Sequence, residues 1–547
     1  MIREAFRGKR VVVTGTTGFL GTAVVEKLLR SVPEVGSIVL PVRAWSADHA
    51  ANRVRDEVVA SPAFGPLREQ AGEDRFVELV AKLEAVPMDI TRDDGLPDPA
   101  PLAGSDIAVH CAATVSFDPP VDEAFETNLK GSLRFFEWSR AAGVRRYVQV
   151  STAYMVGIRR GEVPEFLPTN DPEAVPVNWR TEIEAVAAAR REVERVSRMP
   201  ERLAEFTAQA KREMGPAGVP AVARRAERIR TQWVTDRLVE RGNARARALG
   251  FPDVYAMTKN LTERALVETR GDVELAIVRP SIIESAIREP FPGWIRGFRV
   301  AEPIILAYGR GALEDFPGLP EGIIDIVPVD LAVNCILAAA AAPIAPEDDP
   351  PAYHVVSGSR NPLRYGEAFG FVRDYFRDHP LLDEDGQPID APDWKFPGQE
   401  SIRTRLRRGT RALERAQRVL RFLPASGRVR DAVDAVERSR QRVQFLGRYA
   451  NLYGPYAEFE AVFLDDRARA LEDSLDDEER ALFPFDPSGI DWAHYWGVLH
   501  LPAVAEGRDA PRRRPPAGVV VERAPEGATV LAAFDLEGTV AATNVIE

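Results

Sequence analysis

The sequence predicts an α/β protein built on a doubly wound parallel sheet, with a helical insertion and a mostly helical C-terminal domain. Three observations support this fold class. Between residues 10 and 150, continuous apolar runs alternate with amphipathic runs, as in parallel strands that helices cover on both faces. Residues 159–250 interrupt the alternation with a helical pattern rich in Arg, Glu and Ala. After about residue 363, helical periodicity dominates again.

The elements of the sheet follow one another along the chain. A strand at RVVVTG, a helix at FLGTAVVEKLLRSV and a strand at GSIVLPVR come first. The strands AVPMDI and DIAVHCAA, the helix DEAFETNLKGSLRFFEWSRAAG and the strand RRYVQVST come next. After the insertion, the pattern resumes at VELAIVRPSI and ends at AYHVVSG. We therefore expect one sheet with one insertion.

Composition and charge exclude several classes of function. The chain has 547 residues and a net charge of −12, which disfavours nucleic acid as a partner. Its two cysteines, Cys111 and Cys335, lie far apart and fit a reducing cytoplasm. The six histidines do not cluster with other ligand residues, so we expect no metal. No run approaches the ~20 apolar residues of a membrane span, and the first apolar run is too short for a signal peptide.

A glycine-rich turn joins the first strand to the first helix, in VVVTGTTGFLG. Gly15 allows the tight turn, Gly18 lets the backbone approach a pyrophosphate, and Gly21 lets helix and strand pack closely. The same loop contains Thr16, Thr17, Phe19 and Leu20. We therefore expect a dinucleotide to bind here, on a Rossmann-type sheet. The G-x-x-G-x-x-G spacing resembles that of extended short-chain dehydrogenases/reductases.

The second strand is expected to end beside the adenosine ribose of the cofactor. An acid there favours NAD, because it accepts from the 2′-hydroxyl, whereas a cation favours NADP, because it pairs with the 2′-phosphate. The strand ends in LPVRAW, which supplies Arg43 and no acid, and Arg53 in the following helix is a second candidate. Asp89 and Ile90 are placed to flank the adenine. The sequence therefore predicts NADPH.

Four residues match the catalytic set of the short-chain dehydrogenase/reductase superfamily. Tyr255 and Lys259 stand in VYAMTK, and VQVSTAYMVG supplies a hydroxyl at the end of a strand. By its spacing within that run, Thr152 matches the catalytic hydroxyl better than Ser151. Asn128, in FETNLKGS, matches the structural and proton-relay Asn of the superfamily.

These residue types suit carbonyl reduction. The Lys259 ammonium is expected to lower the pKa of the Tyr255 phenol from ~10, and to hold the nicotinamide ribose. The phenol then acts as the general acid, and Thr152 donates a second hydrogen bond to the developing oxyanion. The helical insertion fills the long interval between Thr152 and Tyr255, and we expect it to shape or cover the substrate entrance.

The stretch AIVRPSIIESAIREPFPGW (276–294) resembles fatty acyl-CoA reductases. VPVDLAVN, YHVVSGSRNPL and LFPFDPSGIDWAHYWGVLHL match the same family further along the chain. The resemblance implies a long-chain acyl-CoA substrate, NADPH, and an aldehyde or primary alcohol as product. It assigns Pro280, Ser281 and Ile282 to the nicotinamide contact, and Ala112 and Ala113 complete the expected cofactor contacts.

The implied chemistry needs no covalent acyl-enzyme. Hydride reaches the thioester carbonyl, the hemithioacetal expels CoA thiolate, and a second NADPH reduces the aldehyde in the same site. Cys111 is accordingly expected to be a packed core thiol. The alternative on the same fold is a sugar-nucleotide epimerase or dehydratase, which would keep NAD bound and use the same Tyr, Lys and Thr.

The resemblance divides the chain into an NADP-binding reductase domain at 8–362, with its insertion at about 159–250, and a helical fatty acyl-CoA reductase C-terminal domain at 363–505. A charged, Pro-rich linker is expected at 506–528.

The final residues, 529–547, contain AAFDLEGT, which resembles the D-x-D-G-T opening of haloacid-dehalogenase-type phosphatases. Asp535 would be the nucleophile, and Glu537 stands where that family has an Asp. So short a stretch cannot bury a core. We therefore expect a truncated domain start without phosphatase activity.

Residues 401–448 form a strongly basic helical block in an otherwise acidic chain, with apolar residues between its arginines. Three interpretations stay open. The block contacts an anionic membrane surface, it binds the phosphates of CoA, or it packs on the reductase domain with solvated arginines. We expect a cytoplasmic protein, peripheral at the membrane if the first holds. The sequence does not indicate an oligomeric state.

Overall fold

The structure is a computed structural model of the chain. It describes residues 1–92, 99–215, 218–297, 301–345, 348–383, 385–420 and 459–505, together with helical residues scattered between 433 and 457 and two short strands near the C-terminus. The expected linker at 506–528, and with it Asp535 and Glu537, lies outside the described residues.

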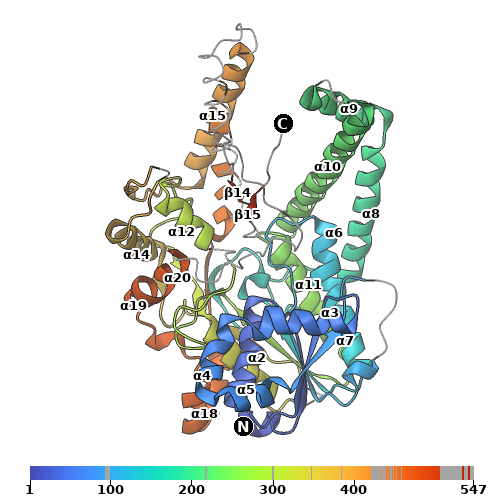
Figure 1. Cartoon of the computed structure of the whole chain (residues 1–547), viewed down its shortest axis with the longest axis vertical. Coiled ribbons are helices and arrows are strands. Elements are labelled where there is room, and N and C mark those ends of the chain that lie inside the picture. The colour runs from blue at the N-terminus through green and yellow to red at the C-terminus, as the bar shows by residue number, and fades with distance from the viewer. Residues whose placement is uncertain are drawn as a thin grey trace.

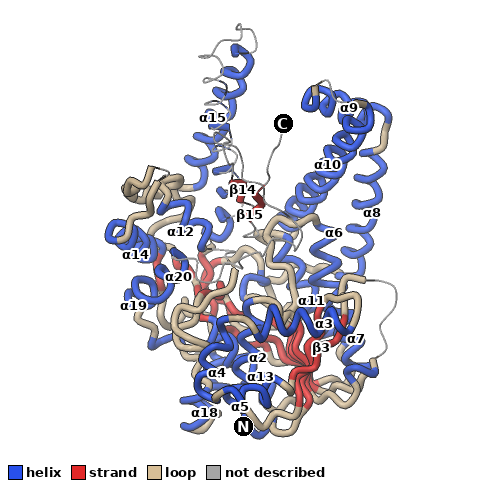
Figure 2. Tube along the Cα trace, viewed as in Figure 1, coloured by secondary structure: helices blue, strands red, loops and turns tan. Residues whose placement is uncertain are grey.

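The central sheet is drawn in red in Figure 2. It consists of seven parallel strands in the order β11-β7-β5-β4-β1-β2-β3. They are β1 (Arg10–Thr14), β2 (Ser37–Val42), β3 (Leu83–Pro87), β4 (Ile107–His110), β5 (Arg146–Val150), β7 (Glu274–Pro280) and β11 (Ala352–Val355). The order reverses between β1 and β4, and a crevice at such a reversal is where open α/β sheets bind ligands. The predicted doubly wound sheet is confirmed.

Helices surround the sheet and extend from it. They are α1 (Ile2–Phe6), α2 (Phe19–Ser31), α3 (Ala47–Arg53), α4 (Gly65–Ala71), α5 (Glu73–Val80), α6 (Val121–Ala124), α7 (Gly131–Ala141), α8 (Trp179–Ser197), α9 (Pro200–Met214), α10 (Val219–Ala248), α11 (Val254–Thr269), α12 (Glu302–Gly309), α13 (Val329–Ala341), α14 (Tyr365–Asp378), α15 (Gln399–Leu420), α17 (Asp466–Asp473), α18 (Asp477–Leu482), α19 (Trp492–His494) and α20 (Leu501–Ala505).

Short strands pair outside the main sheet. They are β6 (Arg160–Val163) with β13 (Glu460–Phe463), β8 (Ile282–Glu284) with β10 (Ile326–Pro328), β9 (Ile323–Ile324) with β12 (Leu363–Arg364), and β14 (Ala532–Phe534) with β15 (Val540–Ala542).

Each face of the sheet has its own hydrophobic core, because successive side chains of a strand point to opposite faces. Val11 and Val13 of β1 belong to the cluster that also contains Val24 of α2 and Ile336 of α13. Val12, between them, belongs to the cluster with Trp138 of α7. The strands are thus buried on both sides, as their continuous apolar sequences predict.

The insertion is an arm of three helices, α8–α10, that extends from the body of the molecule (Figure 1). At the base of the arm, the chain that enters the insertion is hydrogen-bonded to the chain that leaves it. The Ile158 N–H donates to the Gly250 carbonyl at 2.7 Å, and a Cβ on Gly157 would lie 2.7 Å from the same oxygen. This closure brings Thr152 and Tyr255 together despite the long interval.

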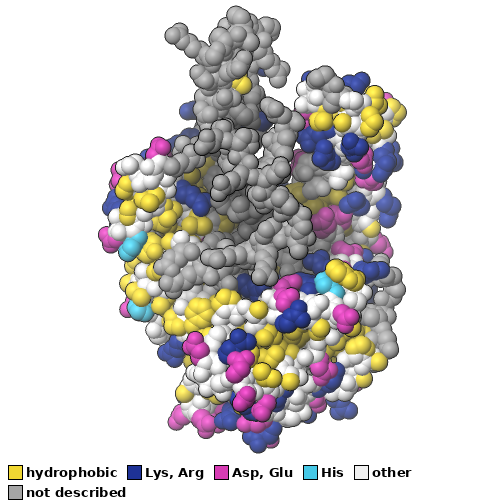
Figure 3. Space-filling model, viewed as in Figure 1, with side chains coloured by type: hydrophobic (Ala, Val, Ile, Leu, Met, Phe, Trp, Pro, Cys, Tyr) yellow, Lys and Arg dark blue, Asp and Glu magenta, His cyan; other side chains and the backbone are white. Residues whose placement is uncertain are grey.

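The arm's surface mixes basic and acidic side chains (Figure 3). The prediction of a helical insertion omits β6, which pairs with a strand near the C-terminus.

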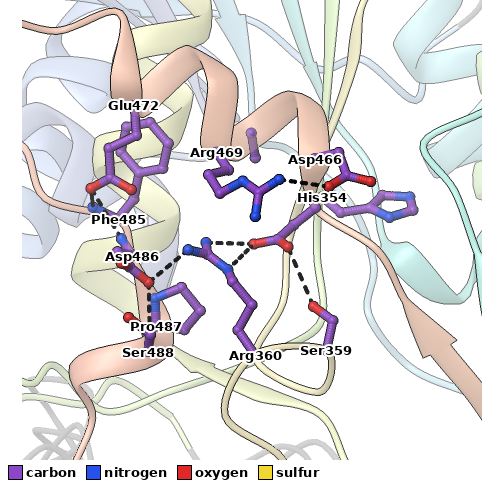
Figure 4. A network of polar contacts seen from close by, with 12 residues as sticks. His354, Ser359, Arg360, Asp466, Arg469, Glu472, Phe485, Asp486, Pro487 and Ser488 are labelled. Carbon is purple, nitrogen blue, oxygen red and sulfur yellow. Dashed lines mark hydrogen bonds and ion pairs between the residues drawn. The ribbon is translucent and has the colours of Figure 1, made fainter.

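The C-terminal segment completes the sheet domain rather than standing apart from it. Buried side chains such as Leu471 and Tyr495 lie in the same hydrophobic cluster as β1 and α2. A polar network also joins the two parts (Figure 4): Arg360, beyond β11, pairs with Asp465 at 2.5 Å and with Asp486 at 2.9 Å. The boundary expected at residue 363 therefore does not separate two hydrophobic cores.

Candidate active site

A cavity of about 770 Å³ lies at the carboxyl ends of the central strands. Its lining includes these residues predicted from the sequence: Gly15, Thr16, Thr17, Gly18, Phe19, Leu20, Gly21, Arg43, Arg53, Asp89, Ile90, Ala112, Ala113, Thr152, Tyr255, Lys259, Pro280, Ser281 and Ile282. The fold therefore brings segments from across the chain into one site. Of the predicted set, Asn128 alone is not part of this lining.

The glycine loop has the close backbone packing that a pyrophosphate cradle requires. Gly15 has a φ of +71°, and a Cβ there would lie 2.9 Å from the Ala112 nitrogen. A Cβ on Gly21 would collide with the backbone of Gly15. The loop runs into the N-terminus of α2, where free N–H groups favour an anion. The buried Thr16 hydroxyl has no partner among the described residues and lines the cavity, so the loop fits a bound dinucleotide.

The two arginines at the adenosine end differ in their surroundings. Arg43 is exposed, and no described residue forms an ion pair with its guanidinium. Arg53 already pairs with Glu57 at 2.7 Å and donates to the Arg43 carbonyl at 2.7 Å. The Arg43 guanidinium thus lines the cavity without an ion-pair partner among the described residues, whereas Arg53 supports the loop that carries Arg43.

Asp89 and Ile90, which are predicted to flank the adenine, both line the cavity. One Asp89 oxygen, Oδ1, accepts from the Thr91 N–H at 3.0 Å and from the Thr91 hydroxyl at 2.7 Å. These bonds fix the carboxylate beside the cavity. Ile90 packs against the start of α7, since a Cβ on Gly131 would lie 3.1 Å from its side chain.

Arg296 is a cavity-lining cation that the sequence does not single out. Its guanidinium donates to the Thr22 hydroxyl at 2.8 Å, and Thr22 in turn donates to the Gly18 carbonyl at 2.6 Å. Arg296 therefore lies beside the glycine loop, within reach of the pyrophosphate position. It follows the EPFPGW run, where only a three-dimensional contact reveals its place.

Tyr255 and Lys259 lie on the first turns of α11, opposite the end of β5. The Thr152 hydroxyl hydrogen-bonds to the Tyr255 phenol, which favours Thr152 over Ser151 as the second donor. The Lys259 ammonium lies 5.9 Å from the centre of the Tyr255 ring and donates to the Val150 carbonyl at 2.9 Å. Two hydrogen-bond donors, a phenol and a hydroxyl, thus converge at one point of the cavity.

The predicted lowering of the pKa of Tyr255 by Lys259 is wrong for this arrangement. Burial raises the pKa of the phenol well above its usual value, the charge of Asp253 raises it further, and the hydrogen bond from Thr152 opposes both. The Lys259 ammonium, 5.9 Å from the centre of the ring, does not offset the effect of burial. Burial lowers the pKa of Lys259 itself to about 8. Tyr255 is therefore firmly protonated at neutral pH, as a general acid must be.

Asn128 braces the site from behind the cavity. Its side chain accepts from the Thr114 N–H at 2.8 Å, and donates to the Thr114 carbonyl at 3.0 Å and to the Thr258 hydroxyl at 3.1 Å. Its backbone carbonyl oxygen accepts from the hydroxyls of Ser132 and Thr262. These contacts fit the structural role, and the proton-relay role stays a prediction.

Cys111 packs against the core cluster of β1 and α2, as expected of a core thiol, but it is only half-buried and also lines the cavity. Burial nevertheless raises its pKa to about 12, opposed only in part by Lys259. A thiol of this kind stays protonated at neutral pH and is a poor nucleophile.

Beside Tyr255, the cavity is lined mainly by the apolar cluster that contains Phe117, Phe316 and Tyr453. Its far wall is formed by Ile304, Ile305, Phe316, Ile324, Tyr365, Ala368, Phe369, Tyr453, Tyr456 and Trp496. We call this part the apolar chamber. No described residue between 159 and 250 lines the cavity, so the expectation that the insertion shapes the substrate entrance gains no support. The C-terminal segment, together with α12 and its neighbours, provides the wall instead.

The chain is similar to several known proteins over most of its length. The family described as "Male sterility protein" matches residues 13–336. "Probable fatty acyl-CoA reductase 5" of Arabidopsis thaliana is 30% identical over 526 residues, covering 91% of this chain and 97% of the relative. "Alcohol-forming fatty acyl-CoA reductase" of Simmondsia chinensis is 28% identical, covering 92% and 98%. Among solved structures, the terminal R domain from the myxalamid PKS-NRPS pathway has a TM-score of 0.54 at 14% identity over 92% of each chain, a likeness of fold.

Proposed function

Because the chain belongs to the fatty acyl-CoA reductase family, we propose that it uses NADPH to reduce long-chain fatty acyl-CoA to the aldehyde and then to the primary alcohol, releasing CoA. One observation carries the proposal: a single cavity runs from Arg43, past Tyr255, to the apolar chamber. The order of its parts matches a cofactor with a 2′-phosphate, a carbonyl to be reduced and a fatty chain.

NADPH, when bound, supplies the hydride. Tyr255 gives its proton to the thioester oxygen as the carbonyl carbon gains that hydride, and Thr152 donates a second hydrogen bond to the same oxygen. The hemithioacetal then collapses: its O–H proton returns to Tyr255, the C–S bond breaks, and CoA leaves as a thiolate that takes a proton from solvent. The result is an aldehyde held by the same two donors.

The second reduction reuses the same residues. Once the oxidised cofactor has been exchanged, the aldehyde carbon gains a second hydride and Tyr255 protonates the alkoxide to give the alcohol. Each reduction consumes one proton, which the medium must restore. Because the apolar chamber lies directly beyond Tyr255, an aldehyde with a long chain is held by burial of that chain while the cofactor is exchanged.

The apolar chamber also weighs against a sugar-nucleotide substrate. A sugar needs polar partners for its hydroxyls, and buried polar groups without partners are costly. The far wall is instead made mainly of aliphatic and aromatic side chains, although Asp118 and Glu302 also line the cavity. The predominance of apolar side chains therefore favours a fatty chain over the epimerase or dehydratase alternative.

The test is the stoichiometry of turnover. Palmitoyl-CoA and NADPH are supplied to the full chain, and cofactor oxidation, free thiol and lipid product are measured at completion. We expect two NADPH oxidised per CoA released, with hexadecanol as product, and no turnover of a UDP-sugar. One NADPH per CoA with hexadecanal would limit the proposal to aldehyde formation, and turnover of the UDP-sugar alone would refute it.

Peripheral membrane contact through the basic block is part of the same proposal. The described helix α15 extends from the body and exposes Arg403, Arg405, Arg407, Arg408, Arg411, Arg415 and Arg418 (Figure 1). Arg405 pairs with Asp315 at 2.9 Å, whereas the others suit anionic headgroups. Among the described residues, no helix is both long and apolar enough to cross a bilayer.

Co-sedimentation with anionic vesicles tests this contact. We expect binding at low salt that weakens as salt screens the charges. Absence of binding even at low salt would leave α15 as a solvated helix. A higher Michaelis constant for acyl-CoA after the arginines are neutralised, without vesicle binding, would assign the block to the CoA phosphates.

A further inference from the structure

The N-terminus of the catalytic helix α11 is joined to the C-terminal segment by one hydrogen bond. The Tyr456 hydroxyl donates to Asp253 Oδ2 at 2.5 Å. The other oxygen, Asp253 Oδ1, accepts from the Ala256 N–H at 2.8 Å and so caps α11, two residues before the proposed general acid. Asp253 is only 5% exposed. A carboxylate so deeply buried needs partners, and these two elements supply them.

We propose that Asp253 and Tyr456 are positioning residues for Tyr255. Asp253 fixes the first turn of α11 and keeps the phenol protonated, and Tyr456 holds Asp253 in its ionised form. This inference rests on the proposed function, because it assigns a task to residues that act through Tyr255.

Aromatic packing supports the same link. The ring of Tyr456 lies 5.1 Å from that of Phe117 and 5.1 Å from that of Tyr154, between centroids. Phe117 in turn lies 6.3 Å from Tyr255. Tyr456 and Tyr255 both line the cavity, so the C-terminal segment reaches α11 through the hydrogen bond to Asp253 and, by way of Phe117, through tilted and edge-to-face ring contacts. A displaced Tyr456 would disturb both contacts.

The electrostatic effect has a definite sign. The ionised Asp253 disfavours a phenolate nearby, and this is the second cause, after burial, of the raised pKa of Tyr255. Burial raises the pKa of Asp253 to about 6, and its hydrogen bond from Tyr456 is the largest of the effects that lower it.

Several other titratable or polar side chains lie around Asp253 and Tyr456. The Asp118 carboxylate, after β4, raises the pKa of Asp253. Lys259 lies on α11 itself, and Cys111 and Thr152 approach from β4 and β5. Tyr154 and Tyr456 remain protonated because burial raises the pKa of each. Asp253 is thus the group of this set expected to titrate near pH 6.

Two isosteric variants separate the two effects. Asp253→Asn keeps an N-cap, since Asn caps helices as well as Asp does, but removes the charge. The pKa of Tyr255 then falls and any acid limb of kcat near pH 6 disappears, because Asn does not titrate, while the alkaline limb, set by Lys259 with its pKa of about 8, stays in place. Tyr456→Phe keeps the ring but removes the hydrogen bond. The pKa of Asp253 then rises, and the acid limb moves to higher pH while the alkaline limb stays in place.

The experiment is the pH dependence of kcat with saturating NADPH and palmitoyl-CoA, for the wild type, both variants and Tyr449→Phe. Tyr449 is buried in the same segment, is not part of the cavity lining, and its hydroxyl has no described partner, so its loss should leave the profile unmoved. Cofactor binding by fluorescence confirms that each variant is folded. If Asp253→Asn does not fold, Tyr456→Phe carries the test alone.

Two failures are distinguishable. If the wild type oxidises no NADPH with acyl-CoA, the proposed function is wrong. If the wild type turns over but Asp253→Asn and Tyr456→Phe lower the rate equally at every pH, or not at all, the link is merely structural and this inference is overturned.

Discussion

The two halves of the cavity are built in different ways. The cofactor half consists of short local motifs: the glycine loop, the end of β2 and the first turns of α11. The apolar chamber is assembled from single residues of α12, α14 and the segment around Tyr453, which lie far apart along the chain. The first half must present fixed donors and charges, whereas the second must only exclude water. Local motifs therefore identify the residues of the cofactor half, whereas the residues that form the apolar chamber are found only in the structure.

We expect the largest effect from Tyr255, the proton donor that lies where the cofactor half meets the apolar chamber. Tyr255→Phe removes the proton but keeps the ring, so we expect kcat to fall at least about a hundredfold, while NADPH binding stays largely intact. Single-turnover reduction and cofactor binding check both parts. A variant that keeps more than about a tenth of the wild-type rate, a loss of less than ~1.4 kcal/mol, would show that another group is the acid.

The next largest effect concerns the polar end of the cofactor half. Arg43→Ala should weaken NADPH by roughly 1.5–3 kcal/mol and NADH far less, because only NADPH carries the 2′-phosphate. Arg53→Ala is the matched control. Since Arg53 is already paired with Glu57 and acts on the site through the loop that carries Arg43, its loss should weaken NADPH by less than the loss of Arg43. Dissociation constants for both cofactors decide this, and equal losses in Arg43→Ala would make Arg43 a structural residue.

A smaller effect is expected beside the glycine loop. Arg296→Ala should weaken NADPH and NADH equally, by about 1 kcal/mol, because a pyrophosphate is common to both. Arg296→Lys should restore part of the loss and leave the binding sensitive to salt. If neither variant changes cofactor affinity, Arg296 serves only to hold Thr22.

The sequence predicts site residues that belong to a short local motif, and it misses those that reach the site only through the tertiary fold. Gly15, Tyr255 and Lys259 could be found because a tight turn and a single helical turn fix their spacing. Arg296, Ala368 and Tyr456 could not, because their roles depend on contacts across the fold that leave no spacing signal.

Two other features escaped the sequence for similar reasons. The direction of the pKa shift of Tyr255 depends on burial and on the approach of Asp253, neither of which a Tyr–Lys spacing encodes. The strand β6, RGEV, is mostly exposed and lacks apolar alternation, so only its pairing with β13 defines it. The sheet itself was predictable because its strands are apolar throughout.

The central claim is that one cavity joins a cofactor half to an apolar chamber for the acyl chain. It is tested most directly by kcat/KM across saturated acyl-CoAs from butyryl to stearoyl, in the wild type and in Ala368→Phe, which adds a ring to the chamber wall on α14. We predict a rise of up to about 0.8 kcal/mol, or about fourfold, per methylene until the chamber is full, and a maximum at a shorter chain in Ala368→Phe. A wild-type profile that does not depend on chain length, or a maximum that Ala368→Phe leaves in place, would contradict the account.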